Sequence, residues 1–123
     1  MEQKKILVVE DEETVRRFMK VYLEFENFRV VEASNGKEAL ELVLKEKPDL
    51  VVTDLMMPEM DGEQLYKAMK ENEETRSIPI IVVSVKNNFD DVQAAYLKGV
   101  DDYLTKPFDP KSLVEKIREI LPS

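Results

Sequence analysis

The sequence predicts an α/β protein in which helices cover both faces of a doubly wound, five-stranded parallel sheet. Short runs rich in Val, Ile and Leu alternate with segments whose apolar residues recur every three or four positions. These are the patterns of buried strands and of amphipathic helices, and their alternation is typical of a parallel sheet. The 123 residues are enough for one core, so we expect a single domain over residues 1–123.

The first strand is expected at Ile6–Val9, a continuous apolar run that suits a strand buried on both faces. A helix is expected over residues 13–26 because apolar side chains recur there at helical spacing. These side chains are Val15, Phe18, Met19, Tyr22 and Leu23.

A second strand is expected at Phe28–Ala33, and its more polar character suits an edge of the sheet. Asn35 with Glu38 three residues later is a capping-box signal for the start of the next helix. The apolar side chains of that helix are Ala39, Leu40, Val43 and Leu44.

The third and fourth strands are expected at Leu50–Thr53 and Ile80–Val83, both rich in β-branched residues. Between them, Asp61 can cap a helix whose apolar side chains are Leu65, Tyr66 and Met69. A further helix, marked by Val92, Ala95 and Tyr96, is expected to end at Gly99.

The last strand is expected at Tyr103–Thr105, and Asp109 followed by Pro110 is the usual start of a helix. The apolar stripe of this helix is Leu113, Val114, Ile117, Ile120 and Leu121.

Polar residues follow four of the expected strands at the point where each one ends. They are Glu10 with Asp11, Asp54, Ser84 and Lys106. Parallel strands end at one edge of a sheet, where ligands bind in open α/β folds. We therefore expect three acids, a hydroxyl and an ammonium group to meet at one small site.

Each of these residues has an ordinary role beside a functional one. Asp54 is as well explained by capping a turn as by a phosphoryl-accepting nucleophile. Glu10 and Asp11 are either a solvated acidic loop or part of a Mg²⁺ site. Lys106 is either a surface lysine or a partner of Asp54 and of a phosphoryl group, and Ser84 is either a cap or a donor to a phosphoryl oxygen.

Convergence favours the functional alternatives. Two like charges about 4 Å apart repel by ~1 kcal/mol in water and ~4 kcal/mol at an effective dielectric of 20. Three converging acids therefore need a cation, and Lys106 supplies only one positive charge.

Composition limits the classes of function. The net charge of −8 disfavours direct binding of nucleic acid. The chain has no Cys and no His, so disulfides, thiol chemistry and histidine chemistry are excluded unless a partner supplies them. No apolar stretch approaches the roughly 20 residues of a membrane span, and we expect a cytoplasmic protein without membrane insertion.

Three segments resemble the receiver domain of bacterial two-component response regulators. They are Ile6–Glu12 (ILVVEDE), Asp54–Pro58 together with Met60–Gly62 (DLMMP and MDG), and Gly99–Phe108 (GVDDYLTKPF). The resemblance extends from Ile6 to Leu121. It implies a CheY-like, flavodoxin-like sheet with strand order 2-1-3-4-5, an order that belongs to the family and is not shown by the spacing of this sequence.

The resemblance also implies the chemistry at the strand ends. Asp54 corresponds to the residue that accepts the phosphoryl group and forms an aspartyl phosphate. Asp11 and Asp54 would bind Mg²⁺ directly and Glu10 mostly through water, and the backbone carbonyl of Met56 would complete the metal site. Lys106 would bridge the acid and the phosphoryl group.

Ser84 corresponds to the switch hydroxyl and Tyr103 to the switch aromatic, although the sequence alone favours Tyr103 as a plain core aromatic. The Lys106–Pro107 bond is typically cis in the family. The implied partners are a sensor histidine kinase or a phosphotransfer protein, and a downstream protein target. Phosphorylation would change the surface formed by the fourth helix, fifth strand and last helix, for docking or for homodimerisation.

Three positions differ from the commonest family pattern: Glu10 replaces Asp, Val85 follows Ser84 in place of a small residue, and Val100 replaces Ala.

Two other functions are less favoured. An aspartate-based phosphohydrolase usually has a second acid at the position of Met56, and a flavin module would need a phosphate loop where this chain has four acids. The sequence leaves open whether the chain works alone or belongs to a longer regulator.

Overall fold

The computed structural model describes residues 3–55, 57, 59–85 and 99–122. The helix expected around Val92 and Tyr96, and the backbone carbonyl of Met56, lie outside these residues. Within the described part of the chain, none of the helices has the length and apolar character that a membrane crossing requires.

A parallel sheet of five strands forms the centre of the fold, in the order β2-β1-β3-β4-β5. The strands are β1 (Lys5–Val9), β2 (Arg29–Ala33), β3 (Leu50–Asp54), β4 (Ile80–Val85) and β5 (Asp102–Lys106). This confirms the predicted sheet and its order. The described helices are α1 (Glu13–Phe25), α2 (Gly36–Glu46), α3 (Gly62–Glu71) and α5 (Pro110–Ile120).

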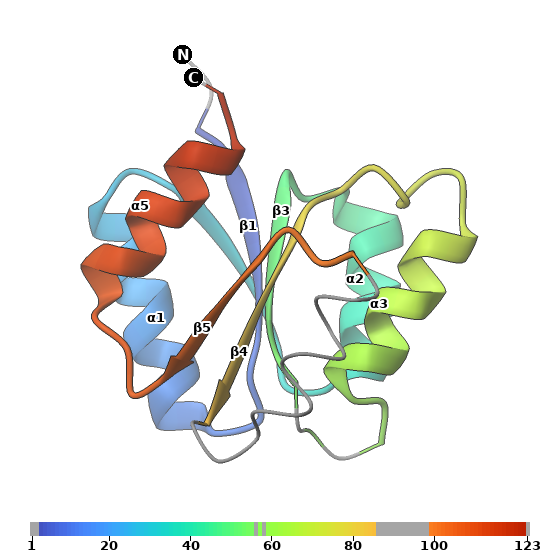
Figure 1. Cartoon of the computed structure of the whole chain (residues 1–123), viewed down its shortest axis with the longest axis horizontal. Helices are drawn as coiled ribbons and strands as arrows, with labels where there is room; N and C mark the ends of the chain where they lie inside the picture. Colours follow the sequence, from blue (N-terminus) through green and yellow to red (C-terminus); the bar gives the residue numbers. More distant parts are fainter. Residues whose placement is uncertain (1–2, 56, 58, 86–98, 123) are drawn as a thin grey trace.

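The helices cover both faces of the sheet, with α1 and α5 on one face and α2 and α3 on the other (Figure 1). Side chains of a strand alternate between the two faces. Ile6 and Val8 therefore pack on the α1/α5 side, whereas Leu7 and Val9 pack on the α2/α3 side. This two-sided burial explains why the strands read as continuous apolar runs.

Strands β3, β4 and β5 extend further at their carboxyl ends than the sequence predicts. The apolar runs predict that the strands stop before the polar residues, but Asp54, Ser84 and Lys106 are themselves strand residues. The backbone pairing continues past the last apolar side chain, because the ladder hydrogen bonds do not depend on side-chain polarity.

Side-chain caps begin three of the described helices. Asn35 accepts a hydrogen bond from the Glu38 N–H, but the Glu38 carboxylate turns back to Ser34 instead of closing the predicted capping box on Asn35. A complete capping box forms in α3 between Asp61 and Gln64. Asp109 caps α5, with Pro110 at the first helical position as predicted.

Two residues of the predicted apolar stripes are not in the core. Phe18 of α1 is 55% exposed and Leu44 of α2 is 37% exposed. The buried face of α1 is narrower than the apolar stripe in its sequence predicts. Its fully buried residues are Met19 and Leu23. Val100, in contrast, is buried on the α2/α3 side.

Candidate functional site: an acidic cluster and a lysine at the carboxyl edge of the sheet

Strand pairing places the predicted site residues along one edge of the sheet. Asp54 at the end of β3 lies opposite Val83 of β4, and Lys106 at the end of β5 lies opposite Val85. Ser84 of β4 therefore lies between the strands that carry the acid and the lysine. Glu10 and Asp11 follow β1, which pairs with the other side of β3.

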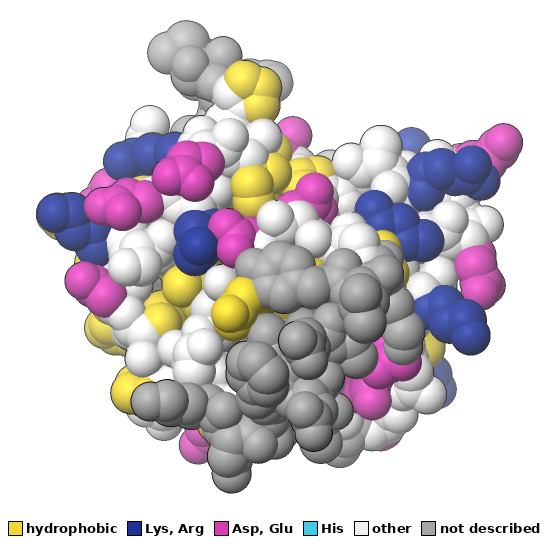
Figure 2. Space-filling view, viewed as in Figure 1, with side chains coloured by type: hydrophobic (Ala, Val, Ile, Leu, Met, Phe, Trp, Pro, Cys, Tyr) yellow, Lys and Arg dark blue, Asp and Glu magenta, His cyan; other side chains and the backbone are white. Residues whose placement is uncertain are grey.

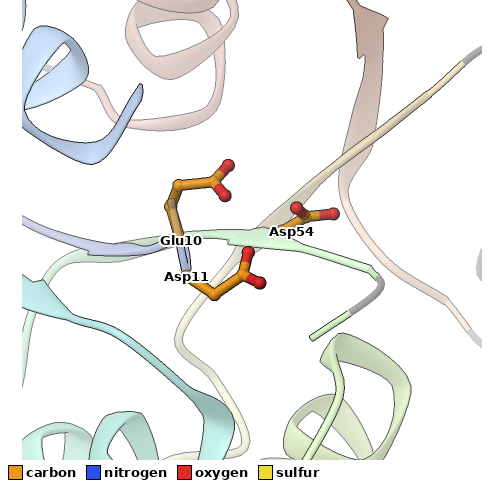
Figure 3. Close-up of side chains that lie close together, drawn as sticks. All are labelled: Glu10, Asp11 and Asp54. Carbon is orange, nitrogen blue, oxygen red and sulfur yellow. The ribbon is translucent and has the colours of Figure 1, made fainter. Parts of the chain in front are cut away.

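Three carboxylates meet at this edge. Glu10, Asp11 and Asp54 each have an oxygen that lies within 4.8 Å of the corresponding oxygens of the other two. Figure 3 shows Glu10 and Asp11 leaving the end of β1 in different directions, with their carboxyl groups on the side of Asp54. Glu10 is 2% exposed and Asp54 is 9% exposed, whereas Asp11 is exposed to solvent.

The ammonium group of Lys106 binds two of these acids. Its Nζ lies 2.6 Å from Glu10 Oε1 and 2.9 Å from Asp54 Oδ2. Glu10, Asp54 and Lys106 each lie two residues after a side chain that faces α1 and α5, namely Val8, Val52 and Leu104. The alternation of the strands therefore directs all three toward the same side of the sheet edge.

Burial and pairing shift the acid–base behaviour of this group. Burial raises the pKa of the Glu10 carboxyl, and its hydrogen bond with Lys106 offsets only part of that effect. Burial also acts to lower the pKa of Lys106, but the hydrogen bonds and charges of Glu10 and Asp54 outweigh it, so that the pKa lies above its ordinary value. Lys106 is therefore a cation throughout the neutral range.

Ser84 has a buried hydroxyl group without a hydrogen-bond partner among the described residues. Its side chain is 1% exposed. A buried hydroxyl without a partner costs about 1–3 kcal/mol. Such a group at the same edge of the sheet as Asp54 and Lys106 fits a site that receives a hydrogen-bonding ligand.

The residues present also fit a hard divalent cation. All three acids offer carboxylate oxygens, the ligands that Mg²⁺ prefers, and exposed Asp11 leaves one side of the cluster open to water. One lysine among three carboxylates leaves two negative charges. A divalent cation would cancel this excess.

The remaining predicted residues belong to β4 and β5 or follow them directly. Tyr103 is half-buried and packs against the core on the α2/α3 side. Val85 is 42% exposed, and the Lys106–Pro107 peptide bond is cis, as the resemblance implies.

Two supporting features were not predicted from the sequence. Arg16 of α1 donates a hydrogen bond to the Glu10 carbonyl at 2.8 Å and pairs with Glu32 of β2. Gly62 at the start of α3 lies against the backbone of Asp54 and Leu55, and its N–H donates to the Leu55 carbonyl at 3.0 Å. A glycine beside a capping aspartate is the sequence signal that could have indicated this close approach.

Comparison with known proteins identifies the family. The family model described as "Response regulator receiver domain" matches residues 6–118. The transcriptional regulatory protein SrrA of Staphylococcus aureus (strain NCTC 8325 / PS 47) is 40% identical over 116 residues, which are 94% of this chain and 47% of SrrA. The chain thus spans about half the length of the curated relatives it matches.

Solved structures agree with this result. A putative response regulator from Chloroflexus aurantiacus J-10-fl has a TM-score of 0.93 and 30% identity, covering 99% of this chain and 100% of that one. The chemotaxis response regulator CheY4 of Vibrio cholerae has a TM-score of 0.90 and 27% identity, covering 98% and 100%. This chain belongs to the response regulator receiver domain family of two-component signalling.

Proposed function

We propose that this receiver domain is a signalling switch that accepts a phosphoryl group on Asp54. The observation that carries the proposal is the environment of Asp54. Its nearly buried carboxylate lies 2.9 Å from Lys106 Nζ, and oxygens of Glu10 and Asp11 lie within 4.8 Å of it, close enough to bind one metal ion together. The family is one of switches rather than of classical enzymes, and its members work with histidine kinases.

In the proposed reaction, an oxygen of Asp54 forms a bond to phosphorus while the P–N bond of a partner's phosphohistidine breaks. The partner must supply the histidine, because this chain has none. Mg²⁺, when bound, supplies positive charge to the transferring phosphoryl group, and Glu10, Asp11 and Asp54, together with the Met56 carbonyl, would hold it. Lys106 stabilises the same charge from the other side.

Ser84 and Tyr103 are proposed to carry the signal onward. The unpartnered hydroxyl of Ser84 would gain an acceptor when a phosphoryl oxygen arrives beside it. Tyr103 would then follow toward Ser84 and change the surface that includes β5 and α5. The phosphate shifts the balance between two states only as far as it binds one of them better.

The proposed partners are a sensor histidine kinase or phosphotransfer protein and a downstream protein target, with homodimerisation on phosphorylation as a second output. Side chains of both signs are interspersed over α3 and α5 on the face shown in Figure 2. With a net charge of −8, this surface is more suited to protein partners than to nucleic acid. The printed name of SrrA describes a transcriptional regulator, a property of that longer protein.

The test is phosphate incorporation from a small phosphodonor, measured on a phosphate-affinity gel. The wild type should show a shifted band that needs Mg²⁺ and disappears with hydroxylamine, which cleaves acyl phosphates. Asp54→Asn should abolish the band, whereas Glu41→Gln on the exposed face of α2 should keep it. An undiminished band in Asp54→Asn would rule out Asp54 as the acceptor.

A further inference from the structure

The connection between β1 and α1 carries two of the three acids of the cluster, but it lacks the usual side-chain cap. It consists of Glu10, Asp11 and Glu12. Glu12, at the N-cap position of α1, makes no side-chain capping hydrogen bond with the described residues, whereas a side-chain cap begins each of the other described helices. Contacts from elsewhere therefore hold this connection in place.

Arg16, in the first turns of α1, holds both ends of the connection. Its side-chain Nη1 donates to the Glu10 carbonyl at 2.8 Å, and its backbone N–H donates to the Glu12 carbonyl at 2.9 Å. Asp11 lies between these two residues. The backbone on both sides of Asp11 is thus attached to a single residue of the helix.

Glu32 of β2 orients the Arg16 side chain. Its Oε1 lies 3.3 Å from Arg16 Nε, and its Oε2 lies 3.6 Å from the Nζ of Lys20, one turn further along α1. The Arg16 and Glu32 side chains are 16% and 27% exposed, so solvent screens this pair less than a fully exposed one. A guanidinium group is planar and its donors point in fixed directions, so its two partners together fix its orientation.

The contact with the Glu10 carbonyl also determines how Asp11 leaves the chain. A peptide unit is planar, so holding the carbonyl oxygen of Glu10 holds the N–H and Cα of Asp11 in the same plane. The Glu10 N–H donates to the Ala33 carbonyl of β2 at 3.1 Å. Both backbone groups of Glu10 are therefore tied to β2, one directly and the other through Arg16 and Glu32.

We propose that Arg16 is a positioning residue for the metal-binding acids. With Glu32 as its anchor, it holds the peptide between Glu10 and Asp11 so that both carboxylates lie beside Asp54. The affinity for Mg²⁺ is then set in part by a cation that does not bind the metal. This inference rests on the Mg²⁺ site of the proposed function, but not on phosphoryl transfer to Asp54.

Charge and position make opposite predictions for the loss of Arg16. If only charge mattered, removing a positive charge near the acids would strengthen the binding of a divalent cation. Loss of a residue that orients metal ligands instead weakens binding, typically by about 10–100-fold. Arg16→Gln should therefore raise the Mg²⁺ dissociation constant by about tenfold, measured by NMR titration.

Arg17→Gln is the matched control. It removes the same charge from the next position of the helix, where the side chain is 68% exposed and pairs with Glu13 of α1. The Mg²⁺ dissociation constant of this variant should stay at the wild-type value or fall slightly.

Amide hydrogen exchange in metal-free protein tests the positioning itself. The N–H groups of Glu10 and Glu12 donate to the Ala33 carbonyl and to the Glu10 carboxylate. Both should exchange about tenfold faster in Arg16→Gln. The increase should be smaller at the Val52 N–H in the central strand β3, which exchanges through global unfolding. An equal increase at all three amides would indicate lost stability and not lost positioning.

Two further variants test the anchor and the geometry. Arg16→Lys keeps the charge but loses the planar set of donors, so it should also weaken Mg²⁺ binding, and it serves if Arg16→Gln does not fold. Glu32→Gln should weaken binding as well. In the double variant with Arg16→Gln, the loss should be smaller than the product of the two single effects, because both substitutions break one contact.

Mg²⁺ binding as tight as in the wild type, or tighter, in both Arg16 variants would overturn the inference. An equal loss of affinity in Arg17→Gln would overturn it too. If the wild type binds Mg²⁺ but takes up no phosphate on Asp54, the proposed function fails. The comparison of the Arg16 and Arg17 variants then still decides whether Arg16 positions the acids.

Discussion

Gly62→Ala should perturb the functional site through the backbone that carries Asp54. A Cβ built at Gly62 lies 2.5 Å from the Asp54 carbonyl oxygen and 3.0 Å from the Leu55 Cα. The first distance is about 1 Å shorter than the optimal separation of non-bonded atoms, ~3.5 Å. Both contacts are with backbone, so no side-chain rotation relieves them, and either the start of α3 or the end of β3 must move.

Two opposing effects decide the size of the change in stability. Forcing an extra methyl group into a packed site costs about 1–3 kcal/mol. Replacing glycine by alanine in a helix recovers up to about 1 kcal/mol. We therefore expect the free energy of unfolding to fall by about 1–2 kcal/mol in urea titrations, with an unchanged m-value. The shifted Asp54 should also weaken Mg²⁺ binding.

Lys67→Ala is the control, since it introduces alanine at an exposed position of the same helix. It should leave both the stability and the Mg²⁺ affinity near the wild-type values. The reasoning would be refuted if Gly62→Ala were as stable as the wild type or more stable. Helix propensity would then outweigh the close contact with Asp54.

Three other perturbations test the site. Ser84→Ala removes a buried hydroxyl without a described partner and should raise the free energy of unfolding by about 1 kcal/mol in urea titrations; a loss of stability would mean that the hydroxyl is already satisfied. Because the pKa of folded Lys106 lies above its ordinary value, the stability it contributes is complete below about pH 10.4 and is lost as the pH rises through the folded pKa. The stability difference between wild type and Lys106→Met should thus shrink above about pH 10.4, and a growing difference in urea midpoints would contradict this sign. Mg²⁺ at ten times its dissociation constant should stabilise the wild type by about 1.4 kcal/mol in thermal melts; an equal gain in Asp11→Asn would exclude Asp11 as a ligand.

Most of the fold follows from local signals. The apolar runs and the caps at Asn35, Asp61 and Asp109 locate every described strand and helix to within a few residues. The strand order needed the family resemblance, because apolar runs do not specify which strands are neighbours. The exposure of Phe18 could not be foreseen from periodicity, which marks an apolar face but not how much of it a neighbour covers.

The site was predictable in its members but not in its contacts. Parallel topology brings Asp54, Ser84 and Lys106 to one edge whatever their exact spacing. The contact of Lys106 with Glu10 depends on side-chain reach across two strands, and the support from Arg16 depends on how α1 packs. The alternation of side chains along the strands could have predicted this meeting. Glu10, Asp54 and Lys106 each lie two residues after a side chain that faces α1 and α5.

The charges of the site give an order to the proposed events. Three carboxylates around one ammonium group carry two excess negative charges, a number that one divalent cation cancels. An incoming phosphoryl group adds up to two negative charges and removes the one on Asp54, so without the cation it would enter a site that repels it. Two of the three N–H groups of Lys106 already donate to Glu10 and Asp54, which leaves one for a phosphoryl oxygen. We therefore expect the metal to bind before the phosphoryl group, and phosphorylation without Mg²⁺ should be slow even at high concentrations of donor.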